Sequence, residues 1–317
     1  MTTSSFQRLH VREALFDKNL PALDFVLPGL LTASIGLIVS PGGVGKSFVA
    51  LETALAVAAG RDVFGLWGGH PDQGPVVYLN LEDPILALRH RLSAMGTWIE
   101  RAASMPSHAS QRVDFSKIDW DEVDAHLDVY PAMGTDFAVA VLNERGQPEI
   151  AAGWNGFIES MKVRGPRLVI LDTLNRAIPG LDENSAGHMS LVLSALERLA
   201  RAVECAVVVL HHTNKVSMAA GTGAEQQAIR GSSALSDNAR WQVNLMRMSR
   251  EEGARRGLDD TDRREWIRFD APKMSYAPAT GERWLARTEG GVVVGDQEPP
   301  EVRKTDSAKR KGRSDDI

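Results

Sequence analysis

Short apolar runs alternate with segments of helical periodicity through most of the chain. The runs have strand length and are rich in β-branched residues, and the segments between them carry apolar residues every three to four positions. The expected strands are 34–40, 75–81, 167–172 and 206–210, and the expected helices are 48–59, 85–95, 154–163 and 189–203. This alternation predicts an α/β fold with a doubly wound, mostly parallel sheet and helices on both faces.

The pattern changes outside this central part. Residues 1–30 are expected to form an extended arm, and 239–248, 265–270 and 283–287 are expected to be strands of an antiparallel extension. We therefore place one domain at 31–295. Within it, 102–150 has no long periodic segment and is expected to be a variable insertion of short helices and loops. Residues 296–317 are charged, lack apolar periodicity and are expected to be disordered.

Composition limits the classes of function. The net charge of −5 excludes a basic nucleic-acid coat, so any DNA contact would need a local patch of cations. No apolar run reaches the roughly 18 residues of a membrane span, and the N-terminus lacks a signal-peptide core, so we expect a cytoplasmic protein without a membrane partner. The single cysteine, Cys205, excludes an internal disulfide and is expected to be a core thiol.

A glycine-rich turn follows the first expected strand and opens the first expected helix. Its sequence, Ser40-Pro-Gly-Gly-Val-Gly-Lys-Ser47, fits the phosphate-loop pattern G-x-x-x-x-G-K-[ST], except that serine stands at the first glycine position. Such a loop surrounds nucleotide phosphates with backbone N–H groups and a lysine, and its last hydroxyl binds Mg²⁺. We assign the binding of ATP and Mg²⁺ to Pro41, Gly42, Gly43, Val44, Gly45, Lys46 and Ser47.

Two carboxylates end neighbouring expected strands. Asp172 ends an apolar strand, where an acid holds Mg²⁺ through a bound water. Glu82 follows the 75–81 strand and is a candidate base for the attacking water, a placement that marks the RecA-type arrangement. The structural alternative is that Glu82 or Asp83 caps the helix that begins after Pro84.

Two adjacent histidines, His211 and His212, close the expected strand 206–210. Neighbouring side chains on a strand point to opposite faces, so a shared metal ion is not expected. One of the two could donate a hydrogen bond to the terminal phosphate. A structural role in the core is an equal alternative on the residues alone.

Five segments, in order along residues 23–293, together resemble the RepA family of hexameric replicative DNA helicases of broad-host-range plasmids, within the wider RecA/DnaB-like class. They are 39–47, 77–84, 169–174, 210–215 and 230–242, and the serine at position 40 also matches. The resemblance implies that Arg91 lies near the nucleotide and that His212 is the sensor histidine. It also implies that Arg240 is an arginine finger directed at the neighbouring subunit, whereas the residues alone favour an exposed strand cation.

The resemblance further implies partners. The segment 213–229 would line the channel of a homo-hexameric ring and hold single-stranded DNA, with Lys215 and Arg230 as its cations. A plasmid replication initiator or a primase would be a further partner. The chain departs from the family in 102–150 and at Lys273-Met-Ser275, where a second finger arginine is missing.

Two other classes of function stay open on the sequence. The acidic net charge suits a RecA-like regulatory ATPase that acts on a protein partner without unwinding DNA. A small-molecule kinase is the other alternative, but no arginine-rich lid can be recognised and Glu82 supplies a base for water.

Overall fold

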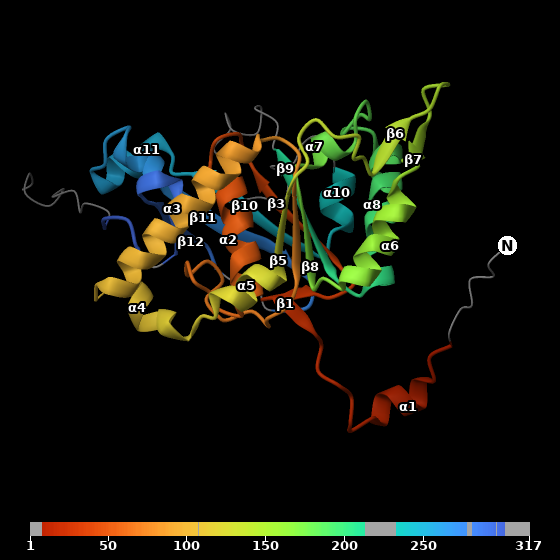
Figure 1. The fold of residues 1–317 in the computed structure, drawn as a ribbon, viewed down its shortest axis with the longest axis horizontal. Coiled ribbons are helices and arrows are strands. Elements are labelled where there is room, and N and C mark those ends of the chain that lie inside the picture. The colour runs from red at the N-terminus through yellow and green to blue at the C-terminus, as the bar shows by residue number, and fades with distance from the viewer. Residues whose placement is uncertain (1–7, 107, 213–232, 278–280, 296, 302–317) are drawn as a thin grey trace, which may run out of the picture.

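The computed structural model describes residues 8–106, 108–212, 233–277, 281–295 and 297–301. Its centre is a nine-stranded sheet with the order β13-β12-β11-β10-β3-β9-β8-β4-β5 (Figure 1). The strands from β10 to β5 run parallel, and β11, β12 and β13 extend the sheet in antiparallel fashion. The bounds are β3 Ile35–Ser40, β4 Val76–Asn80, β5 Leu127–Pro131, β8 Leu168–Asp172, β9 Ala206–His212, β10 Trp241–Arg247, β11 Trp266–Met274, β12 Arg283–Arg287 and β13 Val293–Val294.

Helices cover both faces of the sheet, because successive strand residues point to opposite sides. Along β9, for example, Val208 belongs to one core and Val209 to the other. The first core is covered by α2 (Lys46–Ala59), α3 (Ile85–Ser104) and α5 (Trp120–His126), and the second by α6 (Trp154–Arg164), α8 (Ala186–Val203) and α10 (Ser233–Asn238) (Figure 1). The shorter elements are α4 His108–Arg112, η1 Phe115–Lys117, α7 Leu174–Ala177, α11 Arg250–Arg256, η3 Asp262–Glu265 and η4 Glu289–Gly291.

The predicted fold class is confirmed, and the largest difference lies in 102–150. This region holds the short helices that the sequence indicates, but it also adds the edge strand β5 to the main sheet beside β4. Because β5 is an edge strand, its residues are only partly buried and include Asp128, so no continuous apolar run reveals it. A separate hairpin of β6 (Ala140–Leu142) and β7 (Pro148–Ile150) completes the region.

The first thirty residues divide into two parts. Helix α1 (Val11–Phe16) has no buried residue and lies away from the sheet (Figure 1). In contrast, β1 (Phe25–Leu27) and β2 (Leu30–Leu31) form a hairpin with three side chains fully buried in the first core: Val26, Leu27 and Leu30. The apolar lead-in that the sequence assigns to the arm therefore packs as part of the folded body.

Two further observations concern the whole described chain. Cys205 is buried, and burial raises the pKa of its thiol to about 12, as expected of a core thiol. None of the helices in the described ranges is both long and apolar enough to cross a lipid bilayer.

Candidate active site

The carboxyl ends of four parallel strands bring the predicted polar residues to one edge of the sheet. The register pairs Ser40 of β3 with His212 of β9, and Asn80 of β4 with Asp172 of β8. Glu82 follows two residues after the end of β4. Ligands of open α/β sheets bind at this edge, so the fold itself assembles the candidate site.

The glycine-rich turn connects β3 directly to α2. Gly43 and Gly45 have φ values of +73° and +119°, a left-handed backbone that side chains rarely adopt. The first turn of the 14-residue helix α2 has no side-chain cap, which leaves its N–H groups to an anionic ligand. Ser40 is an extended strand residue whose hydroxyl donates to the carbonyl of Pro41 at 2.9 Å, so its backbone does not require glycine.

Lys46 points from the start of α2 to the end of β9. Its Nζ lies 3.1 Å from Nδ1 and 3.3 Å from Nε2 of His212. Burial lowers the pKa of Lys46 to about 8, although the carboxylates of Asp172 and Glu82 act in the opposite direction. The ammonium group therefore lacks the full solvation or ion pairing that would stabilise its charge.

Glu82 reaches the same group of side chains. Its Oε1 accepts a hydrogen bond from the hydroxyl of Thr173 at 2.8 Å and lies 3.8 Å from Nε2 of His212. The His212 ring, and to a lesser extent Thr173 and Lys46, lower the pKa of Glu82 to about 2 against the opposing effect of burial. Glu82 is thus ionised at neutral pH and held by β8 and β9 rather than by helix α3.

Asp172 has one carboxylate oxygen bound and one free. Its Oδ2 accepts from the Tyr78 hydroxyl at 2.6 Å and from Nδ2 of Asn80 at 3.4 Å, whereas the buried Oδ1 has no partner in the described ranges. Burial raises the pKa of Asp172, and Tyr78, Ser47 and Lys46 lower it. An unpartnered buried oxygen near the Ser47 hydroxyl fits a hydrated cation such as Mg²⁺.

Arg91 lies beside the phosphate loop without touching Lys46. Its Nη1 is 2.7 Å from Oδ2 of Asp83, and its guanidinium carbon is 5.8 Å from the centre of the Phe48 ring in the first turn of α2. Asp83 therefore holds Arg91, and its carboxylate does not cap helix α3, which begins after Pro84 without a side-chain cap. This contact leaves the neighbouring Glu82 directed into the site.

The described site can be compared with known proteins. Residues 2–218, more than half of the chain, match the AAA domain family. The chain belongs to this family.

Solved structures agree with the family in fold. A structure of a single ATPase domain matches with a TM-score of 0.53 and 16% identity, over 90% of this chain and 95% of that one. A DnaB-like replicative helicase, described with its interactions with primase, matches with a TM-score of 0.53 and 15% identity, over 83% of this chain and 57% of that one. At such identities the likeness establishes the RecA-like P-loop ATPase fold of this AAA domain chain.

Arg240 lies at the opposite edge of the sheet from Lys46. It directly precedes β10, and the pairing of Trp241 with Gly36 places it beside the start of the P-loop strand. Arg240 is exposed, and no carboxylate of the described ranges forms an ion pair with it. The structure therefore does not bring Arg240 to the phosphate loop of its own chain.

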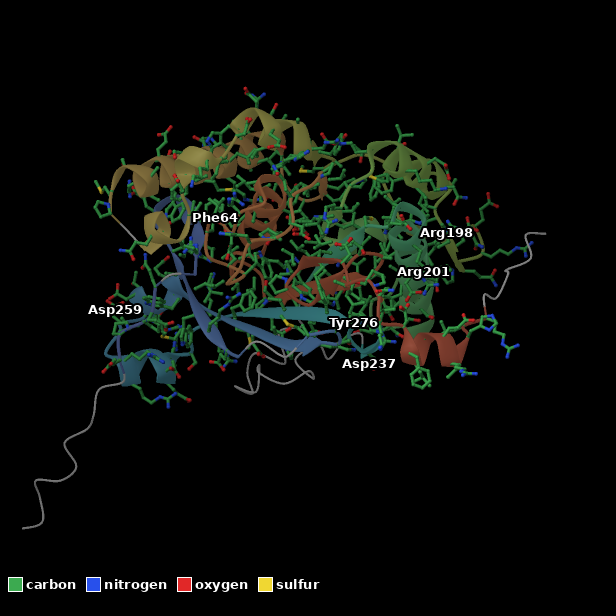
Figure 2. The ribbon with its side chains drawn as sticks, turned by 90° about the horizontal axis from the view of Figure 1, so that it is seen from below. Phe64, Arg198, Arg201, Asp237, Asp259 and Tyr276 are labelled. Atoms are coloured by element: carbon green, nitrogen blue, oxygen red, sulfur yellow. The ribbon has the colours of Figure 1, made fainter. Side chains whose placement is uncertain are left out.

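Lys273 shares this second edge with Arg240. Its Nζ donates to the carbonyl oxygens of Ser236 and Asp237 at 2.7 and 2.8 Å, at the end of α10. Figure 2 shows Asp237 and Tyr276 at this end of the sheet. A second finger role for Lys273 stays a proposal, and its observed contact is a helix C-cap.

The two adjacent histidines diverge as expected of strand neighbours. His212 faces Lys46, whereas His211 is buried with Nδ1 3.8 Å from Oε2 of Glu183. Burial, followed by the charge of Lys46, lowers the pKa of His211 to about 4. The predicted DNA contacts, Lys215 and Arg230, lie outside the described residues, as does most of the expected tail.

Sequence reasoning missed several residues that complete the site. Tyr78, Asn80 and Thr173 support Asp172 and Glu82, and their positions at strand ends could have indicated this. Arg247 and Arg287 end β10 and β12 and both contact the phosphate loop. The sequence does not reveal that these two strand ends lie beside β3, because strand order is not written in local patterns.

Proposed function

We propose that the protein is an ATP-driven, ring-forming replicative DNA helicase of a plasmid or mobile element, a homo-hexamer that hydrolyses ATP between subunits. The observation that carries this proposal is the separation of two groups of residues. One edge of the sheet holds Lys46, Glu82 and Asp172, and the other exposes Arg240 without an ion-pair partner in the described ranges. The fold shared with a DnaB-like replicative helicase supports the same function.

Binding of the nucleotide would use the phosphate loop. The N–H groups of 42–47 and the dipole of α2 would receive the phosphate oxygens, and Lys46 would pair with the terminal phosphates. Bound Mg²⁺ would neutralise phosphate charge. The Ser47 hydroxyl and, through water, Asp172 Oδ1 are the groups that would hold it.

Hydrolysis would use Glu82 to orient and deprotonate water. A carboxylate with a pKa of about 2 is a weak base, but the negative charge of a phosphate close by would raise that pKa. Phosphate binding would also draw Lys46 away, which removes one of the groups that lower the pKa of Glu82. The base would therefore gain strength when the substrate is present.

His212 would report the state of the nucleotide. In the described structure its ring is the hydrogen-bond partner of Lys46, and it stands at the end of β9 where residue 213 begins the segment assigned to DNA. When Lys46 turns to a phosphate, His212 loses this partner. We propose that this change is transmitted to 213–229, with Lys215 and Arg230 contacting the DNA backbone.

Arg240 would act on the neighbouring subunit. Its position at the far edge suits a head-to-tail ring, in which one edge of each subunit faces the opposite edge of the next. There it would stabilise negative charge on the terminal phosphate in the transition state. A replication initiator or a primase would load or follow such a ring, as the interaction of a DnaB-like helicase with primase suggests.

A strand-displacement assay on forked DNA tests the proposal. We expect ATP hydrolysis stimulated by single-stranded DNA and unwinding that Lys46→Ala abolishes. The alternative is a RecA-like regulatory ATPase that acts on a protein partner, favoured by the net charge of −5. Hydrolysis that single-stranded DNA does not stimulate, without unwinding, would reject the helicase and favour this alternative.

A further inference from the structure

Two arginines contact the outside of the phosphate loop. Arg247, the last residue of β10, donates from Nη2 to the carbonyl oxygen of Gly43 at 2.5 Å. Arg287, the last residue of β12, donates from Nη2 to the same oxygen at 3.2 Å and also to the carbonyl oxygen of Val44. Two guanidinium groups thus converge on two consecutive peptide units of the loop.

This contact is unusual in its charge balance. Neither arginine forms an ion pair with a carboxylate in the described part of the chain. Burial lowers the pKa of Arg247, and so do the neighbouring charges of Arg287, Arg264 and Arg263. The two cations are therefore held close to each other against their repulsion, which an anion on the loop would relieve.

The C-terminal hairpin holds Arg287 in place by contacts with helix α2. The carboxyl group of Glu52, fully buried in α2, accepts from the N–H of Val293 at 2.8 Å. The turn before β13 packs so tightly on the same helix that a Cβ at Gly291 would lie 2.8 Å from the Phe48 ring. The helix that begins with Lys46 therefore also carries the strand that delivers Arg287.

The planarity of the peptide bond gives these contacts a consequence. In a trans peptide the C=O of one residue and the N–H of the next point in opposite directions. Holding the carbonyls of Gly43 and Val44 from outside therefore turns the N–H groups of Val44 and Gly45 to the inside of the loop. Gly43 and Gly45 have a freely varying backbone, so without such contacts the loop would lose more entropy on fixing this shape.

We propose that Arg247 and Arg287 are positioning residues that hold the loop in its phosphate-binding shape and supply positive charge behind it. This inference rests on the proposed nucleotide site. Both arginines act in the same subunit as the loop, in contrast to Arg240. Because a donor on a carbonyl strengthens the N–H of the same peptide group as a donor, each contact also improves the phosphate-binding N–H groups.

The test is nucleotide binding by Arg247→Ala, Arg287→Ala and the double variant, measured as the Kd of ADP and of a non-hydrolysable ATP analogue. We expect each single change to weaken both ligands about tenfold, because a charge-assisted hydrogen bond is worth a factor of this size. The turnover rate at saturating ATP should change less than the Kd. A structural role alone would instead lower the melting temperature without nucleotide and leave the Kd unchanged.

Conservative variants and a control sharpen the test. Arg247→Lys keeps the charge and Arg247→Gln keeps a donor, so intermediate affinities for both would separate the two contributions and would also serve if the alanine variants fold poorly. Arg268→Ala is the matched control, because Arg268 lies on β11 of the same sheet, 3.9 Å from Glu282, and does not contact the loop. It should bind nucleotide like the wild type.

Two outcomes separate this inference from the proposed function. If Lys46→Ala abolishes binding while the arginine variants bind within twofold of the wild type, the positioning role is rejected and the nucleotide site stands. If Lys46→Ala leaves nucleotide binding intact, the nucleotide site itself is rejected.

Discussion

The two edges of the parallel sheet differ in how far one chain completes them. At the carboxyl edge, His212 lies 3.1 Å from Lys46 and 3.8 Å from Glu82, and Thr173 adds a further hydrogen bond. At the amino edge, Arg240 is exposed and has no ion pair among the described residues. The first edge is a nearly finished network, and the second offers a charge without a counterpart.

This difference suggests that the site is shared between subunits. A transition state of phosphoryl transfer needs more positive charge than Lys46 supplies, and Arg240 cannot reach the loop of its own chain across the length of β10. A second copy in head-to-tail contact would bring the two edges together. The variants below test each edge in turn.

The largest effect is expected from Lys46→Ala at the carboxyl edge. Loss of the ammonium group should lower ATP hydrolysis by about 10³-fold, as removal of a preorganised charge does in other active sites. Hydrolysis measured beside Lys162→Ala provides the control, because Lys162 is exposed on α6 and pairs with Glu159. Undiminished turnover in Lys46→Ala would refute the loop assignment.

Glu82→Gln should lower turnover by about 10²-fold, since general-base catalysis typically contributes at least that factor. Nucleotide affinity should be unchanged or higher, because the variant removes a negative charge near the phosphates. Single-turnover hydrolysis and equilibrium binding measure the two quantities. A loss of binding equal to the loss of turnover would mean that Glu82 holds the loop rather than activating water.

Lys273→Ala probes the amino edge with an expected loss of about tenfold in hydrolysis. The lysine holds the end of α10 close to Arg240 through carbonyl contacts with Ser236 and Asp237, and one such charged hydrogen bond corresponds to about this factor. Lys273→Arg should recover part of the rate. If Lys273→Ala is as damaging as Arg240→Ala, the lysine has a catalytic role of its own.

A smaller effect is expected from pH. The pKa of Lys46 in the nucleotide-free protein is about 8, below its usual value, so the group is charged below pH 8 and loses its charge as the pH rises above it. The neutral amine attracts phosphate less, so kcat/KM for ATP should fall up to about tenfold per pH unit above 8. A profile that stays flat to about pH 9.5 would contradict the lowered pKa.

The sequence predicts the fold and the carboxyl edge well for a physical reason. The strands β3, β4, β8 and β9 are buried on both faces, so each is a continuous apolar run followed at once by a polar residue. Parallel strands with their ends aligned then bring Lys46, Glu82, Asp172 and His212 together.

The remaining features depend on contacts that no local pattern encodes. The partly exposed edge strand β5 has no apolar run, and Arg247 and Arg287 acquire their meaning from the position of β10 and β12 beside the loop. The roles of Arg240, Lys215 and Arg230 rest on family resemblance, and they stay predictions.

The most direct test of a shared site is hydrolysis by mixed rings of Arg240→Ala and Glu82→Gln subunits. Each variant alone should be nearly inactive. Random mixing in equal amounts should restore about a quarter of the wild-type rate, because about one interface in four pairs an intact Glu82 with an intact Arg240 from its neighbour.

Arg240→Ala mixed with the double variant Arg240→Ala/Glu82→Gln is the control, since none of its interfaces can contain both groups. The shared-site account predicts activity in the first mixture and none in the second. A first mixture that hydrolyses ATP no faster than the average of its two components would contradict the account.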